Sequence, residues 1–370
     1  MANTRQLSSL EQRLNTWVTD HLRRVSFVQK IFFLDHLRTM LHASLSLVEA
    51  LDILSKEVSN KKLYKVIGEI KLEVESGQTL SVVLARYPSI FPSMYVKMIE
   101  SGELSGKLDE ALEHIVTQMQ KTNTLNSSIR GAMIYPSVIL AAMGGIGIML
   151  ATVVLPKLVE IFKEFDSALP LPTRILIAIV NVLEKPLFLA LIIAGIIAGI
   201  IGFWMLLKKS PPFRRAVHAL NLRLPIIGSV IQKINLARFS LTLSSLLKST
   251  IPIVDAIDIT ADTCGNVLYQ ESLHTAAKRI KTGEALSVLL ETSPRLFPPM
   301  VTEMIMVGER SGQVDQLLTQ LSEFYSTEVD KTMKNFATII EPVIIIILGI
   351  AIGGLAIAVI LPMYSLVQNF

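Results

Sequence analysis

Residues able to bind a metal are few and scattered along this 370-residue chain. The six histidines are His21, His36, His42, His114, His218 and His274. His36 and His42 are six residues apart, whereas two ligands on one helical face need a spacing of three or four. A zinc site would also need partners that the single Cys264 does not supply. The histidine pattern therefore predicts no metal centre.

Two carboxylate pairs do have helical spacing. Glu100 and Glu103 are three residues apart, as are Asp255 and Asp258. Metal-binding carboxylates use this spacing, but so does any solvated helix face, and we favour the second interpretation. The chain contains neither a G-x-x-x-x-G-K-S/T phosphate loop nor a G-x-S-x-G nucleophile elbow. We expect no catalytic residues and no cofactor, so any energy used must come from another molecule.

The composition predicts a membrane protein. Hydrophobic residues make up 51% of the chain and charged residues only 18%, and the mean hydropathy is +0.51. Three windows lack Asp, Glu, Lys and Arg altogether: 131–156, 186–207 and 342–370. Crossing a bilayer takes roughly 20 helical residues, so we expect three transmembrane helices. These three windows contain no Asp, Glu, Lys, Arg or His of the kind that proton and ion pathways need, which argues against a pump or an ion-coupled transporter.

Small residues at helical spacing predict close packing of these spans. Gly195 and Gly199 are four residues apart, as are Gly349 and Gly353, and Gly145 forms a weaker pair with an alanine. Glycine and alanine are common in any span, so packing is one of two interpretations. We favour real contact surfaces, within the chain or between chains.

A long internal repeat organises the sequence. Residues 91–112 and 297–318 have similar sequences. Of the 38 positions in 75–112, 17 are identical to the positions 206 residues further on. The register continues into the membrane, where Leu155 and Pro156 correspond to Leu361 and Pro362. Each copy is therefore a polar module of about 100 residues followed by one span.

The middle span has no counterpart, and it determines the topology. Two copies with one span each would place the modules on opposite sides, and the additional span returns the chain to the first side. Five basic residues follow it within 208–223, and no acidic residue occurs before Asp255, whereas the connector before it is neutral. Positive residues near span ends stay in the cytoplasm. Both modules are therefore expected inside the cell, with the connector and the C-terminal tail outside.

These boundaries divide the chain into nine segments. We expect an N-terminal arm (1–26), module 1 (27–130), a first span (131–156), a connector (157–185), a second span (186–207), a basic linker (208–236), module 2 (237–338), a third span (339–363) and a tail (364–370). The charged first 30 residues do not form a signal peptide, so we expect targeting by the first span. The net charge of +4 is too small and dispersed to predict nucleic-acid binding.

Each module is expected to be an all-α bundle of about six helices. Helical periodicity covers 27–41, 47–58 and 63–74, and Gly77 and Gly283 are expected as left-handed stops after a helix. The last helix of each module is expected to continue into its span, which would make it a stiff connection.

The repeated G-E-x-S-G is expected to be a corner between two helices. The first helix would end at Gly102 or Gly308, and the next would begin after an N-capping Ser105 or Ser311. Its repeated residues are Gly102, Glu103, Ser105, Gly106 and Asp109 in module 1, and Gly308, Glu309, Ser311, Gly312 and Asp315 in module 2. Asp109 and Asp315 would lie in the first turn of the second helix. A hinge explains most of the motif, and a contact of Glu103 and Glu309 with a partner is the alternative.

The doubled block F-P-x-M-x-x-x-M-I-x-x-G-E-x-S-G, each copy leading into a span, resembles the inner-membrane platform proteins of type IV pilus assembly (PilC type) and type II secretion (GspF type). The resemblance covers residues 27–364. Members tend to have Gly after the first helix of each module, where this chain has Ser44 and Thr250.

The resemblance implies a non-enzymatic homo-oligomer in the bacterial inner membrane. Its implied partners are a cytoplasmic hexameric assembly ATPase, pilin or pseudopilin subunits and other inner-membrane assembly proteins. We further hypothesise that Glu103 and Glu309 help to dock the motor. A transporter or channel subunit is the alternative, but it would need mid-span polar residues and inverted repeats. A membrane-tethered enzyme would need a recognisable active site.

Overall fold

The computed structural model describes residues 25–157, 174, 177–178 and 186–368. The expected N-terminal arm and connector therefore lie almost entirely outside the described residues, as do residues 369–370 of the tail. Throughout the described ranges the regular structure is helical, without a strand. The expectation of an all-α protein is confirmed for this part of the chain.

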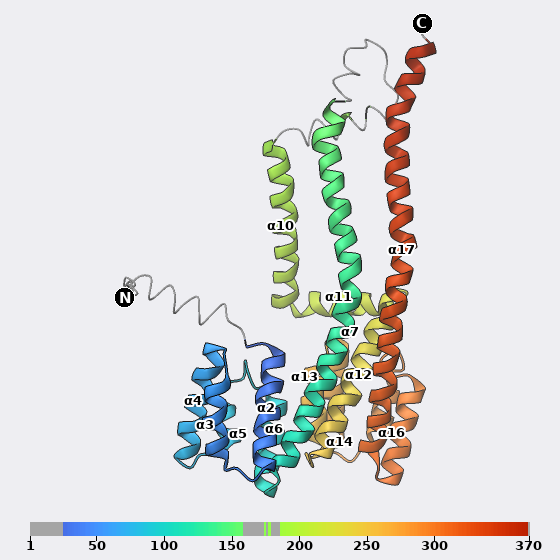
Figure 1. Cartoon of the computed structure of the whole chain (residues 1–370). Helices are drawn as coiled ribbons and strands as arrows, with labels where there is room; N and C mark the ends of the chain where they lie inside the picture. Colours follow the sequence, from blue (N-terminus) through green and yellow to red (C-terminus); the bar gives the residue numbers. More distant parts are fainter. Residues whose placement is uncertain (1–24, 158–173, 175–176, 179–185, 369–370) are drawn as a thin grey trace, which may run out of the picture. The chain divides into compact units, whose positions relative to one another are not determined.

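The chain divides into two compact units, and the first contains both repeats. It comprises residues 1–126 and 225–328, and the second comprises 127–224 and 329–370. In the first unit, module 1 (blue to cyan in Figure 1) contains α2 (Phe27–His42), α3 (Leu47–Glu57), α4 (Lys61–Glu75), α5 (Leu80–Leu84), α6 (Ser93–Ser105) and the start of α7 (Leu108–Met149).

Module 2 repeats this order of helices. It contains α12 (Ile227–Lys248), α13 (Ile253–Thr263), α14 (Val267–Ile280), α15 (Leu286–Glu291), α16 (Pro299–Ser311) and the start of α17 (Val314–Gln368). In both modules consecutive helices pack on each other, as α3 does on α4 and α13 on α14.

Side chains near the chain start fix where the first helices begin. The hydroxyl of Ser26 accepts the N–H of Gln29 while the Gln29 side chain accepts the N–H of Ser26, which forms a capping box at α2. Ser46 and Glu49 form the same arrangement at α3. These reciprocal bonds satisfy backbone donors that an isolated helix end leaves unpaired.

The two cores are built around the same aromatic pair. The rings of Phe33 and Phe91 lie 5.8 Å apart in module 1, and those of Phe239 and Phe297 lie 5.4 Å apart in module 2. All four side chains are buried. The repeat in sequence is thus a repeat of packing.

Four turn residues have a left-handed backbone at repeat-equivalent positions. Gly77 (φ 92°) and Gly283 (φ 91°) follow α4 and α14, which confirms the expected stops. Ser44 (φ 65°) and Thr250 (φ 58°) adopt the same region although they carry a Cβ. L-residues pay about 1–2 kcal/mol for this conformation, so these two turns are strained.

The second unit contains the apolar segments. α7 continues without a break from module 1 to Met149 despite Pro136, and a π-helix (Leu150–Val154) follows. The unit also contains α10 (Pro186–Lys209), α11 (Pro211–Arg223) and the rest of α17. The continuation of each module's last helix into its apolar segment is confirmed.

Among the described residues, one helix, Leu108–Lys157, is long and apolar enough to cross a membrane, and Glu341–Gly354 is a shorter apolar helical stretch. This criterion uses length and composition alone. The expected number of three spans stays a prediction.

Candidate functional site

The repeated corner differs in one respect from the sequence expectation. The first helix does not end at Gly102 or Gly308 but continues to Ser105 and Ser311. Its C-cap is Gly106 (φ 68°) in module 1 and Gly312 (φ 72°) in module 2. Ser105 does not cap the next helix, because its hydroxyl donates back to the carbonyls of Ser101 and Gly102. Glycine at the left-handed position carries no Cβ penalty, so the helix can turn there.

Gly102 and Gly308 instead allow the two helices of the corner to approach each other closely. A Cβ on Gly102 would lie 2.4 Å from the Cβ of Ala111, and one on Gly308 would lie 2.9 Å from the Cα of Val314. Both glycines are buried. Only glycine therefore allows the next helix to fold back so tightly against the first.

The glutamate of each corner caps a neighbouring short helix. The Glu103 carboxylate accepts the N–H of Leu80 at 2.5 Å, the N–H of Ser81 at 3.1 Å and the Ser81 hydroxyl. In module 2, Glu309 accepts the corresponding N–H groups at 2.6 and 3.3 Å and a hydroxyl at 2.5 Å. A carboxylate at a helix N-terminus is favoured by the unpaired donors and the dipole.

Asp109 and Asp315 lie in the first turns of α7 and α17, as expected. Asp109 Oδ2 lies 3.9 Å from Nδ1 of His42, at the end of α2. Docking of a motor by the corner residues stays a prediction, because the bonds of Glu103 and Glu309 described above are internal to each module.

The predicted packing glycines have open surroundings within the described chain. A Cβ placed on Gly145, Gly195, Gly199, Gly349 or Gly353 meets no described atom within 4 Å. The prediction that these glycines form helix contacts, within the chain or between chains, therefore stays untested.

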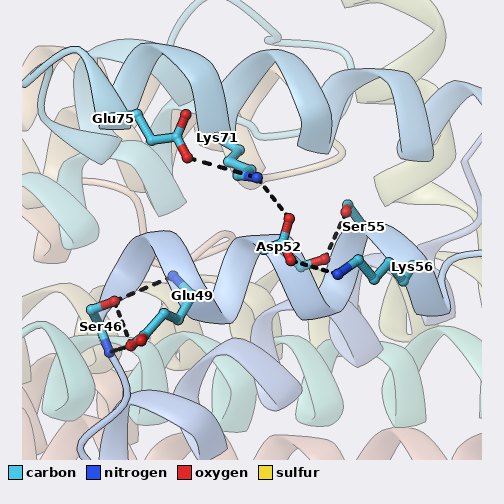
Figure 2. A network of polar contacts seen from close by, with 7 residues as sticks. All are labelled: Ser46, Glu49, Asp52, Ser55, Lys56, Lys71 and Glu75. Atoms are coloured by element: carbon cyan, nitrogen blue, oxygen red, sulfur yellow. Dashed lines mark hydrogen bonds and ion pairs between the residues drawn. The ribbon is translucent and has the colours of Figure 1, made fainter.

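A charged groove lies between α3 and α4 of module 1. It has a volume of about 480 Å³ and is lined by Leu45, Val48, Glu49, Asp52, Ile53, Lys71 and Glu75. Figure 2 shows Asp52 between two lysines: Lys56 Nζ lies 2.7 Å and Lys71 Nζ 2.6 Å from its carboxylate oxygens. Lys71 also pairs with Glu75 at 3.7 Å. The hydrogen bonds from Lys56 and Lys71 lower the pKa of Asp52 to about 2.

Module 2 replaces this network with a different one. Asp258 stands where module 1 has Asp52, but Ala277 replaces Lys71 and Asp262 replaces Lys56. Here His274 Nδ1 lies 2.7 Å from Asp258, and its Nε2 lies 3.3 Å from Asp262. The ion-pair network around this aspartate thus differs between the two modules. Across the described residues, no group of three or more His, Cys, Asp or Glu side chains could hold a metal ion.

The two modules contact each other through polar side chains. Ser101 Oγ on α6 lies 2.8 Å from the carbonyl of Ser249 and 3.1 Å from Thr250 Oγ1. On α7, Gln118 accepts from Ser245 at 3.2 Å. Asn126 accepts from Arg238 Nη2 at 3.2 Å, and burial lowers the pKa of this arginine. Sequence reasoning missed this interface, since its residues have different types in the two copies.

Two equivalent helical modules, each ending in a long helix that runs into an apolar segment, define a tandem-repeat helical protein of membrane type. The chain matches the family described as type II secretion system (T2SS), protein F, over residues 33–156 and again over 239–362. These two segments cover more than half of the chain, and they coincide with the repeat. The chain belongs to this family.

Curated relatives are similar over most of their length. The chain is 35% identical to the type IV pilus assembly protein PilC of Thermus thermophilus, over 90% of this chain and 82% of the relative. It is 33% identical to PilC of Pseudomonas aeruginosa, over 93% and 91%. It is 31% identical to the type II secretion system protein F of Xanthomonas campestris, over 97% and 86%. The resemblance stated from the doubled motif is confirmed.

Proposed function

We propose that this chain is an inner-membrane platform protein of a type IV pilus or a related type II secretion machine. It couples a cytoplasmic hexameric assembly ATPase to the extraction and polymerisation of pilin or pseudopilin subunits. The family membership supports this role, since relatives of both machines match over nearly the whole chain. The protein acts by binding and transmitting movement, without catalysis of its own.

One observation carries the mechanical part of the proposal. The last helix of each module does not end at the module boundary but continues as α7 or α17 into the apolar segment. Each helix is continuous and keeps its backbone hydrogen bonds except where Pro136 in α7 and Pro342 and Pro362 in α17 lack an N–H, so it is stiff over most of its length. A force on either module would therefore be passed to the membrane segments without a flexible hinge.

The topology in this proposal has three spans, at 131–156, 186–207 and 339–363. Both modules and the N-terminus face the cytoplasm, and the connector and C-terminus face outward. The five basic residues after the middle span support this orientation. The glycines of the spans, Gly145, Gly195, Gly199, Gly349 and Gly353, would pack against other spans or against pilin helices.

The motor would dock on the cytoplasmic modules. Asp109 and the exposed Leu104 at the α6–α7 corner, with Asp315 and Arg310 at the equivalent corner, form accessible parts of the repeated motif. Glu103 and Glu309 would support this docking by holding α5 and α15 against the corners.

The test is a deletion of the chromosomal copy, complemented with the full chain or with corner variants. We expect the deletion to abolish surface filaments or secretion and to leave the assembly ATPase and pilin levels unchanged. The assembly ATPase should co-purify with the wild-type chain and not with the double variant Asp109→Lys/Asp315→Lys. Lys61→Glu, at an exposed position of α4, is the control. Normal filaments and secretion in the deletion strain would refute the proposal.

A further inference from the structure

The contact between the two modules is asymmetric, although the modules are copies of each other. Module 1 contributes α6 and α7, through Ser101 and Gln118, and module 2 contributes α12 and the turn after it, through Ser245 and Ser249. On the neighbouring side of α17, Glu323 also pairs with Lys121 of α7 at 3.4 Å. In module 1 the copy of α12 is α2, and in module 2 the copies of α6 and α7 are α16 and α17. Within the chain, the α6–α7 surface of module 1 contacts the α12 surface of module 2. The equivalent surfaces, on α2 in module 1 and around Val307 and Phe324 in module 2, are not used in this contact.

We call the first of these the α2 face, which consists of Phe32, His36, Thr39, Ala43 and Ser44. The second is the α16–α17 face, which consists of Val307, Phe324 and Thr327. Both are exposed at positions where several of the internal equivalents are buried or partly buried. Gln118 is 2% exposed, whereas Phe324, at the equivalent position, is 43% exposed. Arg238 is largely buried, whereas its equivalent Phe32 is 45% exposed.

The residue types on the open faces favour burial. Phe32 replaces Arg238, Phe324 replaces Gln118, and Val307, 57% exposed, replaces Ser101. Three polar contact residues of the internal interface are therefore large apolar residues on the open faces. The Phe32 ring also lies against the His36 ring one turn further along α2, with ring centroids 3.7 Å apart. Covering such surface is favourable by roughly 25 cal/mol per Å², and clustered exposed apolar residues mark interaction sites.

We propose that the α2 face of one copy of this chain docks on the α16–α17 face of a second copy. The contact between chains would repeat the contact that the two modules make within a chain. Val307 would lie opposite Ser44, as Ser101 lies opposite Thr250, and Phe324 would lie opposite Thr39, as Gln118 lies opposite Ser245. The contact is head-to-tail, so it leaves one further face of each kind free at the ends of a dimer and builds rings or rows.

The inference rests on the proposed function in one respect: both modules must lie on the same side of the membrane. The internal contact supplies a built-in reference for testing it, since Ser101 Oγ and Thr250 Oγ1 are only 3.1 Å apart. Cysteines at these two positions are close enough to form a disulfide within one chain. The equivalent pair between chains is Val307 and Ser44.

The experiment uses the full chain in native membranes, with Cys264→Ser so that introduced cysteines are the sole thiols. Two differently tagged chains, one with Val307→Cys and one with Ser44→Cys, are co-expressed and mildly oxidised. We expect a disulfide-linked species that carries both tags, and no dimer when either variant is expressed alone. Val82→Cys with Val288→Cys, exposed and equivalent in the repeat but outside both faces, is the matched control and should not cross-link.

A second pair of variants tests the chemistry of the faces. Phe32→Ser and Phe324→Ser should each reduce the cross-link to the level of the control pair, whereas Val82→Ser should not change it. Failure of the Val307–Ser44 cross-link while the Ser101→Cys/Thr250→Cys chain closes its internal disulfide overturns the inference and leaves the proposed function intact. Self-linking of Val307→Cys, or its linking to another protein, overturns it as well. Failure of the internal disulfide contradicts the shared side of the modules, and with it the proposed function.

Discussion

Glu103 and Glu309, 206 residues apart, bind the start of a short helix in the same way. Each carboxylate accepts two successive backbone N–H groups and one serine hydroxyl, from Leu80 and Ser81 or from Leu286 and Ser287. The residues between these partners and the glutamate form the rest of the short helix, the turn after it and most of α6 or α16. The bonds therefore tie the corner to the preceding helix, which explains why the motif contains a glutamate.

Removing this carboxylate should destabilise its own module. Glu103→Ala leaves two N–H groups in a partly buried place without their charged acceptor, and we expect a loss of about 2–3 kcal/mol. Glu103→Gln keeps one acceptor and should lose less. Pulse proteolysis of the full chain in nanodiscs, across a urea series, measures the loss. Glu113→Ala, on an exposed position of α7, is the control. Equal urea midpoints for Glu103→Ala and Glu113→Ala would contradict the capping role.

The close approach at Gly102 predicts opposite effects of alanine at two helical glycines. Gly102→Ala brings its Cβ to 2.4 Å from Ala111 and should destabilise module 1 by about 1–3 kcal/mol. Gly68→Ala, inside α4 with nothing within 4 Å of a Cβ, should stabilise by up to about 1 kcal/mol. The same proteolysis assay separates them. Ala111→Gly should restore part of the stability lost in Gly102→Ala. A lack of any recovery would mean that the loss comes mainly from contacts of the new Cβ with the backbone.

The left-handed turn at Ser44 predicts a stabilising substitution. Ser44→Gly relieves the Cβ penalty and should raise stability by about 0.5–1 kcal/mol. Thr250→Gly relieves a similar penalty but also removes the hydroxyl that lies 3.1 Å from Ser101 Oγ, so its gain should be smaller. Thermal unfolding of the two variants in the same detergent compares them. A destabilised Ser44→Gly chain would show that the turn is not strained.

Several features could be predicted from the sequence because they are local or repeated. The stops at Gly77 and Gly283, the continuation of α7 and the tandem modules follow from turn chemistry and from the 206-residue register. The sequence places the end of α6 three residues too early, because a glycine in this pattern predicts a stop, whereas the small size of Gly102 serves close packing. The role of Glu103 was missed because its partners lie more than 20 residues upstream. The module interface was missed because Ser101 and Val307 share a register position but not a residue type.

The lysine-bound Asp52 predicts a pH dependence in acid. Its pKa in the folded chain is about 2, lower than the ordinary 3.8, so its contribution to stability is present above the unfolded pKa and is lost as the pH falls toward 2. Asp52→Asn should therefore be less stable than wild type at pH 5, and the difference should shrink toward pH 2. Pepsin susceptibility in urea, measured from pH 2 to 5, tests this. A difference that is constant over this range would contradict the pairing of Asp52 with Lys56 and Lys71.

The most direct test of the platform architecture is the side of the membrane on which each module lies. In a Cys264→Ser background, Leu104→Cys and Arg310→Cys place single thiols at exposed, repeat-equivalent positions of the two corners, and Ser167→Cys places one in the connector. A membrane-impermeant maleimide applied to intact spheroplasts should label only the connector thiol, and all three should react after permeabilisation. Labelling of exactly one of the two corner thiols in intact spheroplasts would put the modules on opposite sides and contradict the account.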